Sequence, residues 1–300
     1  MNIIKLTSER KLDFIHYCRK YRNEFDNTFL DDQELMSFEP NEENPTYILI
    51  DNNNNVVGAA SLIINPYYRR TGSGRFRMFH TIESNKQTYE KMLNLILKHT
   101  MGLQKIFLFL DGKDKKMAEV LKPLNFKIKR YSYTLIKHDL EDMQASFSSG
   151  YELREIRAGR DEADWCKVRN LGFSKIAGCD TPRTPEMYNE MEKDDGHLPG
   201  GIIMLYHDNM PIGQVRASKE VEDESEYVFI SSLCVIPEHQ GKGLGRNLLK
   251  AALNFGKSKG IQKGMLTVNA ENENAVSLYL NEGFEEKSVA ICHEYYVNSK

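Results

Sequence analysis

Three glycines, Gly241, Gly243 and Gly245, alternate with other residues in the stretch PEHQGKGLGRNLL, residues 237–249. The residues before this stretch, 226–236, are apolar for most of their length and predict a central strand, which the proline at 237 ends because it cannot donate to a sheet. Apolar residues then recur at helical spacing. These are Leu244, Leu248, Leu249, Ala252 and Leu253. The glycines are therefore expected at the junction between a strand and a helix.

Such a junction is suited to binding a phosphate group. The first N–H groups of a helix have no partner within the helix, and the helix dipole places partial positive charge there. Glycine lets the backbone approach a ligand closely, so a pyrophosphate is the expected guest, with Lys242 and Arg246 adding charge at the rim. The spacing fits neither the Walker loop nor the dinucleotide fingerprint, since Gly-x-Gly-x-Gly matches neither pattern.

Two motifs resemble those of the GNAT N-acetyltransferase superfamily. Gln240-Gly241-Lys242-Gly243-Leu244-Gly245 is similar to the family's Q/R-x-x-G-x-G/A loop at each defined position. The second motif is similar to L-x-V…N-x-x-A…L-Y…G-F, and it follows at the separation seen in the family. Its residues here are Leu266, Val268, Asn272, Ala275, Leu278, Tyr279, Gly283 and Phe284. This resemblance covers residues 150–300.

The resemblance implies acetyl-CoA as the cofactor, and no metal is expected because the sequence has no C-x-x-C pair. The pyrophosphate would lie on the loop, the pantetheine arm would pair with the preceding strand, and Asn272 would hydrogen-bond that arm. Tyr279 matches the position from which many family members protonate the leaving thiolate, and the N–H group of Leu233 or Cys234 would stabilise the oxyanion. The residues expected to bind the cofactor are Leu233, Cys234, Val235, Gln240, Gly241, Lys242, Gly243, Leu244, Gly245, Arg246, Asn272 and Tyr279.

The general base is less defined by the sequence. Glu226, at the entry of the strand, is the first choice, although it is equally a solvated carboxylate in the acidic run EVEDESE. His293 and Glu294 are second choices, and strand alternation puts one of them on the site's face. Cys234 is interpreted as a strand residue rather than a nucleophile.

Self-comparison indicates a duplicated domain. Residues 48–61 and 203–216 both predict strand, turn and strand, and residues 106–126 and 264–284 both predict strand, helix and a stop before phenylalanine. The predicted division is a degenerate GNAT-like domain at 1–140, a linker at 141–150 and a catalytic domain at 151–300. The predicted fold class is α/β, with a mixed, mostly antiparallel central sheet flanked by helices in each domain.

The N-terminal half departs from the family at the cofactor site. Opposite the glycine loop stands ESNKQTYEKMLNLIL, residues 83–97, which has no glycine. Asp114 and Leu121 stand opposite Asn272 and Tyr279. We therefore expect this domain to keep the fold without the cofactor site, and to pack against the catalytic half or to wall the acceptor pocket with residues 65–77.

Composition bounds the remaining classes. A formal net charge of −3 over 300 residues argues against a nucleic-acid partner, and five scattered cysteines suggest reduced thiols. The sequence has neither a signal peptide nor an apolar run of membrane-spanning length, which predicts a cytoplasmic protein with no membrane partner. Monomer and homodimer both remain open.

The expected function is acetyl-CoA-dependent N-acetyl transfer to the amine of a small molecule or peptide, by direct attack. The alternative is a CoA-binding regulatory protein without turnover. The acceptor is expected to be set by residues 173–186, which include Cys179, Asp180 and Arg183, and their mixed chemistry does not define it.

Overall fold

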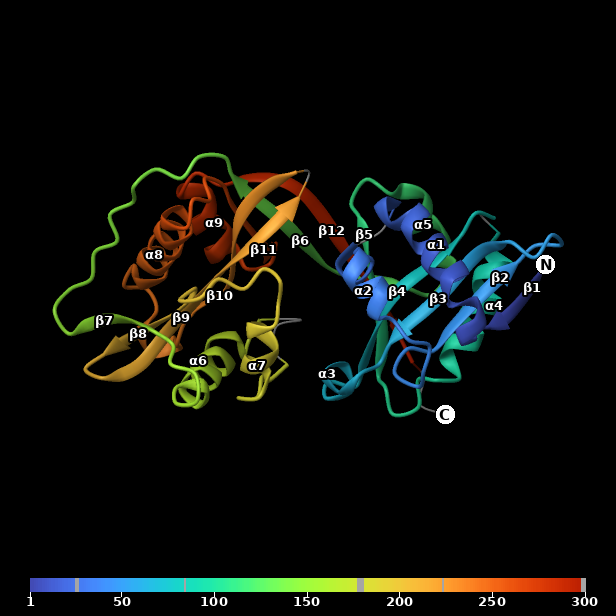
Figure 1. The fold of residues 1–300 in the computed structure, drawn as a ribbon, viewed down its shortest axis with the longest axis horizontal. Coiled ribbons are helices and arrows are strands. Elements are labelled where there is room, and N and C mark those ends of the chain that lie inside the picture. Colours follow the sequence, from blue (N-terminus) through green and yellow to red (C-terminus); the bar gives the residue numbers. More distant parts are fainter. Residues whose placement is uncertain (25–26, 84, 177–180, 223, 298–300) are drawn as a thin grey trace. The chain divides into compact units, whose positions relative to one another are not determined.

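The computed structural model describes residues 1–24, 27–83, 85–176, 181–222 and 224–297. The chain forms two compact units. Unit 1 comprises Met1–Ser132 and Ser288–Lys300, and unit 2 comprises Tyr133–Lys287. Each unit has a mixed, mostly antiparallel sheet with helices on both faces, so the predicted fold class is confirmed (Figure 1).

Unit 1 has the strand order β1-β2-β3-β4-β5-β12. Its first five strands are β1 (Asn2–Lys5), β2 (Thr46–Ile50), β3 (Val56–Ile63), β4 (Ser73–Thr81) and β5 (Lys105–Asp111). Its helices are α1 (Lys11–Tyr21), α2 (Asp32–Ser37), α3 (Pro66–Arg69), α4 (Lys86–Leu97) and α5 (Lys115–Leu121). Short 3-10 turns occupy Ser8–Arg10, Arg22–Glu24, Asn27–Phe29 and Lys122–Leu124. One core packs α1 and α2 against the sheet, and a second packs α4 and α5 against its other face.

Unit 2 has the strand order β6-β11-β10-β9-β8-β7. Its strands besides β6 are β7 (Tyr151–Glu155), β8 (Ile202–His207), β9 (Met210–Glu222), β10 (Ser225–Val235) and β11 (Gly264–Asn269). Its helices are α6 (Glu162–Phe173), α7 (Met187–Glu192), α8 (Leu244–Ser258) and α9 (Glu273–Asn281), with a 3-10 turn, η5, at Pro237–His239. In Figure 1, α8 and α9 lie on one side of this sheet and α6 and α7 on the other.

Helix α8 is held to the sheet by the apolar face that its sequence predicts. Its leucines and alanines at helical spacing are buried, and Leu248 and Leu249 have no exposed surface. Burying one such leucine stabilises the fold by roughly 1.5–3 kcal/mol. The first turn of α8, which follows the glycines, is thereby fixed against the end of β10.

Two strands run from one unit into the other. Strand β6 (Lys127–Lys137) leaves unit 1 after Ser132, and β12 (Glu285–Tyr296) leaves unit 2 after Lys287. Residues Ala290–Tyr296 of β12 pair antiparallel with β5, so the end of the chain completes the sheet of unit 1. The last strand of the chain therefore belongs to unit 1 over most of its length.

The division of the chain consequently differs from the predicted boundary at 141–150. The segment expected to be a linker packs along α8: Asn254 exchanges hydrogen bonds with the backbone of Met143, and Asp142 pairs with Lys257 at 2.8 Å. The side chain of Leu140 is buried in the core beneath α8. These polar residues are ordered by contacts that their composition does not indicate.

A chain that ends at Lys287 should lose the fold of unit 1 while unit 2 keeps its own. The truncation removes the strand that covers β5 and exposes its backbone N–H and C=O groups. Hydrogen exchange of peptides covering Lys105–Asp111 should accelerate to the rate of an unprotected segment. Unchanged protection of β5 in the truncated chain would show that β12 is not needed to complete the sheet of unit 1.

Candidate active site

The site in unit 2 begins where two parallel strands separate. Strands β10 and β11 pair in parallel through Val228↔Gly264, Phe229↔Met265 and Ile230↔Leu266, and the described register goes no further. Both strands continue, β10 to Val235 and β11 to Asn269. Their ends therefore diverge, and the last residues of β10, after Ile230, have no partner strand on the side of β11.

A β-bulge interrupts β10 on its other side. In the register with β9, Ser231 pairs with Arg216 and Cys234 pairs with Gln214, so Ser232 and Leu233 fall in the bulge. Ser232 has φ +53°, a left-handed conformation that is uncommon for a residue other than glycine. Bulges of this kind redirect the backbone next to binding sites. The backbone of Leu233, predicted to bind the oxyanion, is thus outside both ladders.

The glycine loop follows directly. Gly241 and Gly243 have φ values of +76° and +74°, and a Cβ atom added at either position would meet no atom within 4 Å. No hydrogen bond among the described residues uses the N–H groups of residues 241–246, and the first helical bond runs from the N–H of Asn247 to Gly243 O. Gly243 is the N-cap of α8 and no side chain caps the helix. The loop is an open cradle of free N–H donors, the geometry that a pyrophosphate requires.

Charged and amide groups around the cradle have distinct tasks. Lys242 has no ion-pair partner in the described part of the chain, whereas Arg246 pairs with Glu282 at 2.9 Å. Gln240 turns back and donates from Nε2 to Val235 O at 2.8 Å. Gln240 therefore fastens the loop to the end of β10, a positioning contact that the sequence alone did not separate from cofactor binding.

Two further predicted residues lie at the N-cap of α9 and within that helix. Asn272 caps α9 by accepting from the N–H of Ala275 at 3.4 Å, and its amide donor has no hydrogen-bond partner among the described residues. Tyr279 is buried, with its ring 6.0 Å from that of Phe284. Burial, and secondarily the neighbouring Cys234, raise the pKa of Tyr279, so its hydroxyl stays protonated and able to donate.

Cys234 is placed as a structural residue. Its thiol donates to Val168 O at 3.8 Å, and Gly172 of α6 lies so close that a Cβ there would be 2.7 Å from the sulfur. Burial raises the pKa of this thiol to about 12, so it is not a thiolate near neutral pH. The interpretation as a strand residue agrees with this geometry.

The candidates for the general base require correction. Glu226 is exposed, pairs with Lys219 and lies seven residues before Leu233, which is roughly 20 Å along a strand. Neither direct transfer nor one bridging water spans that distance. His293 and Glu294 belong to unit 1, where Glu294 pairs with Lys105 at 2.9 Å. Glu226 therefore does not reach the bulge of β10, and His293 and Glu294 lie in the sheet of unit 1.

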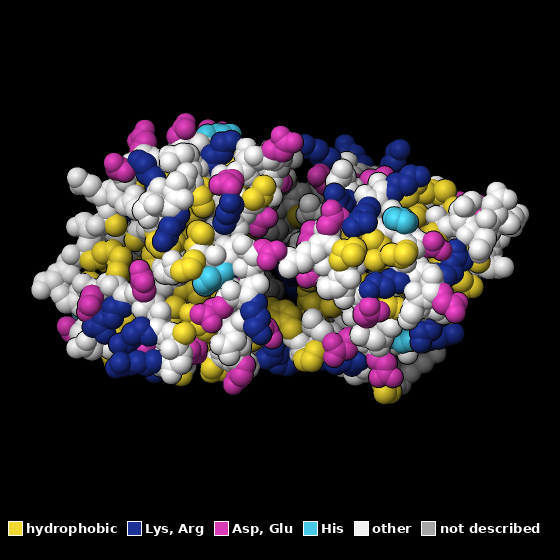
Figure 2. Space-filling model, viewed as in Figure 1, with side chains coloured by type: hydrophobic (Ala, Val, Ile, Leu, Met, Phe, Trp, Pro, Cys, Tyr) yellow, Lys and Arg dark blue, Asp and Glu magenta, His cyan; other side chains and the backbone are white. Residues whose placement is uncertain are grey.

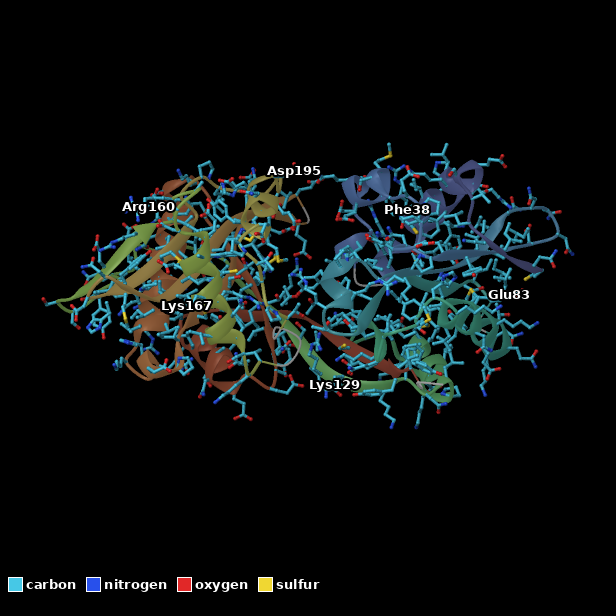
Figure 3. All side chains as sticks on the ribbon, turned by 90° about the horizontal axis from the view of Figure 1, so that it is seen from below. Phe38, Glu83, Lys129, Arg160, Lys167 and Asp195 are labelled. Atoms are coloured by element: carbon cyan, nitrogen blue, oxygen red, sulfur yellow. The ribbon has the colours of Figure 1, made fainter. Side chains whose placement is uncertain are left out.

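Sequence reasoning missed two buried polar side chains on the α6 face. Gln214 lies opposite Cys234 on β9, is 1% exposed, and neither of its amide atoms has a hydrogen-bond partner. Arg169 on α6 donates to Thr181 O at 2.6 Å, while its Nε has no partner. Neither type nor spacing marks them, because a lone glutamine in a strand carries no signal. Helix α6 is found in Figure 3 by Lys167.

The predicted acceptor loop is only partly described. Arg183 donates its backbone N–H to Asn170 at 2.8 Å, and its carbonyl accepts from the amide of Asn170. Cys179 and Asp180 lie outside the described residues.

In unit 1, the segment that begins at Glu83, labelled in Figure 3, enters α4 through Asn85, whose side chain accepts from Gln87 N–H at 2.9 Å. The helix is thus capped by a side chain there, in contrast to α8.

Comparisons with known proteins agree with this geometry. Residues 165–284 match the family "Acetyltransferase (GNAT) family". A mycothiol acetyltransferase of Kocuria rhizophila is 26% identical over 156 residues, which cover 50% of this chain and 51% of that protein. One of Renibacterium salmoninarum is 23% identical over 79% of this chain and 67% of its own length. The match thus spans about half the length of the first relative.

Solved structures show the same fold over the whole chain. A GCN5-related N-acetyltransferase from Sphaerobacter thermophilus has a TM-score of 0.72 at 12% identity, covering 99% of this chain and 96% of its own. A tandem GNAT protein from the clavulanic acid biosynthesis pathway has a TM-score of 0.69 at 12% identity, covering 100% and 99%. Residues 165–284 thus match the GNAT family, and the whole chain has the fold of a tandem GNAT protein. The resemblance inferred from the two motifs is confirmed.

Replacing Gly243 by glutamate should abolish acetyl-CoA binding. The side chain would stand in the open cradle and place a carboxylate where the pyrophosphate is expected, weakening binding at least about a hundredfold, or ~2.8 kcal/mol. The matched control is Gly260→Glu, because Gly260 also has a positive φ, +88°, and open space around it, but lies beyond the far end of α8. Calorimetric titration should find binding intact in the control. Equal loss in both variants would mean that the backbone strain, and not the cradle, is responsible.

Proposed function

We propose that unit 2 is an acetyl-CoA-dependent N-acetyltransferase that acts on the amine of a small molecule or a peptide. The observation that carries this proposal is the adjacency of three features. These are the open N–H cradle of residues 241–246, the bulged and unpaired end of β10, and the hydroxyl group of the buried Tyr279. The relatives named as mycothiol acetyltransferases support acetyl transfer as the reaction class.

The residues present fit the cofactor. The N–H groups of Gly241–Arg246 and the ammonium of Lys242 would hold the pyrophosphate, since a Cβ at Gly241 or Gly243 would fill the space that it needs. The unpaired edge of β10 at Leu233, Cys234 and Val235 would accept the pantetheine arm as a further strand, with the free amide donor of Asn272 beside it. When bound, acetyl-CoA supplies the acetyl group as a thioester.

The protein groups then divide the work of acyl transfer. The N–H of Leu233, which the bulge frees from the β9 ladder, would donate to the developing oxyanion. Tyr279, kept neutral by its burial, would donate its proton to the departing sulfur. Because the thiol of Cys234 is also kept protonated, the acetyl group would pass directly to the amine and not through the enzyme, and the proton that the amine loses would pass to solvent water.

A CoA-binding regulatory protein without turnover is the competing function. The observation that favours it is the position of Glu226, which leaves the predicted base far from the bulge. Such a protein would need the cradle but not the acid at Tyr279, so the two functions separate on that residue.

The surface charges and the helices bear on which partners the protein has. The face shown in Figure 2 has lysines and arginines interspersed with acidic side chains on both units, which does not favour a nucleic-acid partner. No helix among the described residues combines the length and apolarity needed to cross a bilayer.

Tyr279→Phe should lower kcat about a hundredfold and leave the dissociation constant of acetyl-CoA unchanged, because it removes the acid but not the cradle. The readout is thiol release from acetyl-CoA in the presence of a set of primary amines. Tyr227→Phe is the matched control, since Tyr227 is also a buried tyrosine of unit 2, on β10. If the wild type binds acetyl-CoA but releases no thiol with any of the amines in the set, the regulatory function is favoured.

The pH dependence of kcat tests the state of Tyr279. The raised pKa keeps its proton on throughout the neutral and mildly basic range, and the donor is lost only above that raised pKa. The rate at saturating amine should therefore not fall between pH 7 and 9. A descending limb in that range that is present in the wild type and absent in Tyr279→Phe would show that the hydroxyl ionises early and contradict the assignment.

A further inference from the structure

Unit 1 has its own bulge at the equivalent place, and an arginine occupies it. Strand β4 pairs in parallel with β5 as far as Arg75↔Phe107. In the register with β3, Met78 pairs with Ser61 and Phe76 with Leu62, so Arg77 falls in the bulge. The bulge that frees the backbone of Leu233 in unit 2 thus has a counterpart in unit 1, and there the bulged residue carries a charged side chain.

The guanidinium of Arg77 is buried and largely without partners. The residue is 7% exposed, and its Nη2 donates to Asn44 Oδ1 at 3.3 Å. Its Nε and Nη1 have no hydrogen-bond partner. A buried donor without an acceptor destabilises the fold, and it does so more strongly when it is charged.

No acidic side chain of the described residues forms an ion pair with Arg77. Glu34 and Asp31 are the acidic residues whose charges act on the pKa of Arg77, and neither forms an ion pair with it. Asp31 instead caps α2 by accepting from the N–H of Glu34 at 2.9 Å. Burial raises the pKa of Glu34, which weakens it as a counter-charge, and burial lowers the pKa of Arg77.

The surroundings add cations and aromatic rings. Arg77 lies 4.9 Å from the ring centre of Phe38 and 6.0 Å from that of Phe29. Arg75 lies 4.7 Å from the ring of Phe29. Asn44 and Phe29 are half-buried, so the guanidinium lies just beneath the surface on the side of α1 and α2, where Figure 3 labels Phe38. The rings hold the guanidinium in place without supplying an acceptor for its N–H groups.

We propose that Arg77 is the centre of an oxyanion-binding site in unit 1, which takes the carboxylate or phosphate group of a small molecule. An oxyanion supplies both the missing charge and the missing hydrogen-bond acceptors, and guanidinium binds carboxylate and phosphate alike. Unit 1 thereby keeps the fold of its repeat but uses the bulge for a cationic side chain in place of backbone donors. This inference does not depend on the proposed function of unit 2.

The test compares wild type with Arg77→Met in sodium acetate and in sodium phosphate, at ionic strength matched with sodium chloride. Amide exchange on peptides covering β3, β4 and α2 separates this site from an anion bound at the glycine loop. In the wild type, exchange through opening of this region should slow about tenfold at an anion concentration ten times its Kd. Acetate alone identifies a carboxylate site, phosphate alone a phosphate site, and both an unselective oxyanion site.

Arg77→Met should lose the anion effect and, without anion, be at least as stable as the wild type. An apolar side chain of similar volume removes a buried charge that has no partner. Arg69→Met, which removes an exposed arginine of the same unit, should retain the effect. The proposal is overturned if neither anion slows exchange in the wild type or if Arg77→Met keeps the effect. It is also overturned if Arg77→Met unfolds unit 1 without anion, since the charge would then be compensated within the chain.

Discussion

The early end of the parallel pairing between β10 and β11 is the constraint on which the site depends. Three residue pairs hold the two strands together, and beyond Ile230 and Leu266 they diverge. The bulge at Ser232 and Leu233 removes β10 from its other neighbour at the same level. A strand end with free backbone groups inside a folded domain is normally costly. Here it adjoins the glycine loop, whose N–H groups also have no partner among the described residues.

The same constraint is met differently in the two units. In unit 1 the pairing of β4 with β5 also ends early, at Arg75 and Phe107. No glycine opens the next helix there, Asn85 caps it, and the bulge carries the side chain of Arg77. A duplicated fold thus preserves the break in the sheet while the residues at the break decide what it can bind. The exchange of β6 and β12 fits this duplication, because each strand follows the equivalent phenylalanine, Phe126 or Phe284, of its repeat.

Much of unit 2 could be predicted because its signals are local. The alternating glycines, the proline that ends β10 and the spacing of leucines in α8 each act within a few residues, and the structure places them as expected. The role of Tyr279 came from a family resemblance, and its burial beside Cys234 gives that resemblance a physical basis.

The remainder depends on contacts that no local pattern records. The sequence of β12 does not indicate which sheet the strand completes, so the predicted boundary at 141–150 differs from the division that the structure shows. A glutamate at the start of a strand suggests a base until the seven residues to Leu233 are converted into a distance. An arginine side chain within a strand is usually exposed to solvent. The burial of Arg77 against the rings of Phe29 and Phe38 is visible only in the structure.

Amide hydrogen exchange in the presence and absence of acetyl-CoA tests the central claim most directly. We predict slower exchange in peptides covering residues 231–235 and 241–246, and no change in those covering β4 and the start of α4. Protection at the start of α4 would show that unit 1 also holds the cofactor. Absence of protection at residues 241–246 would show that the glycine loop is an ordinary turn, and the account of the site would fail.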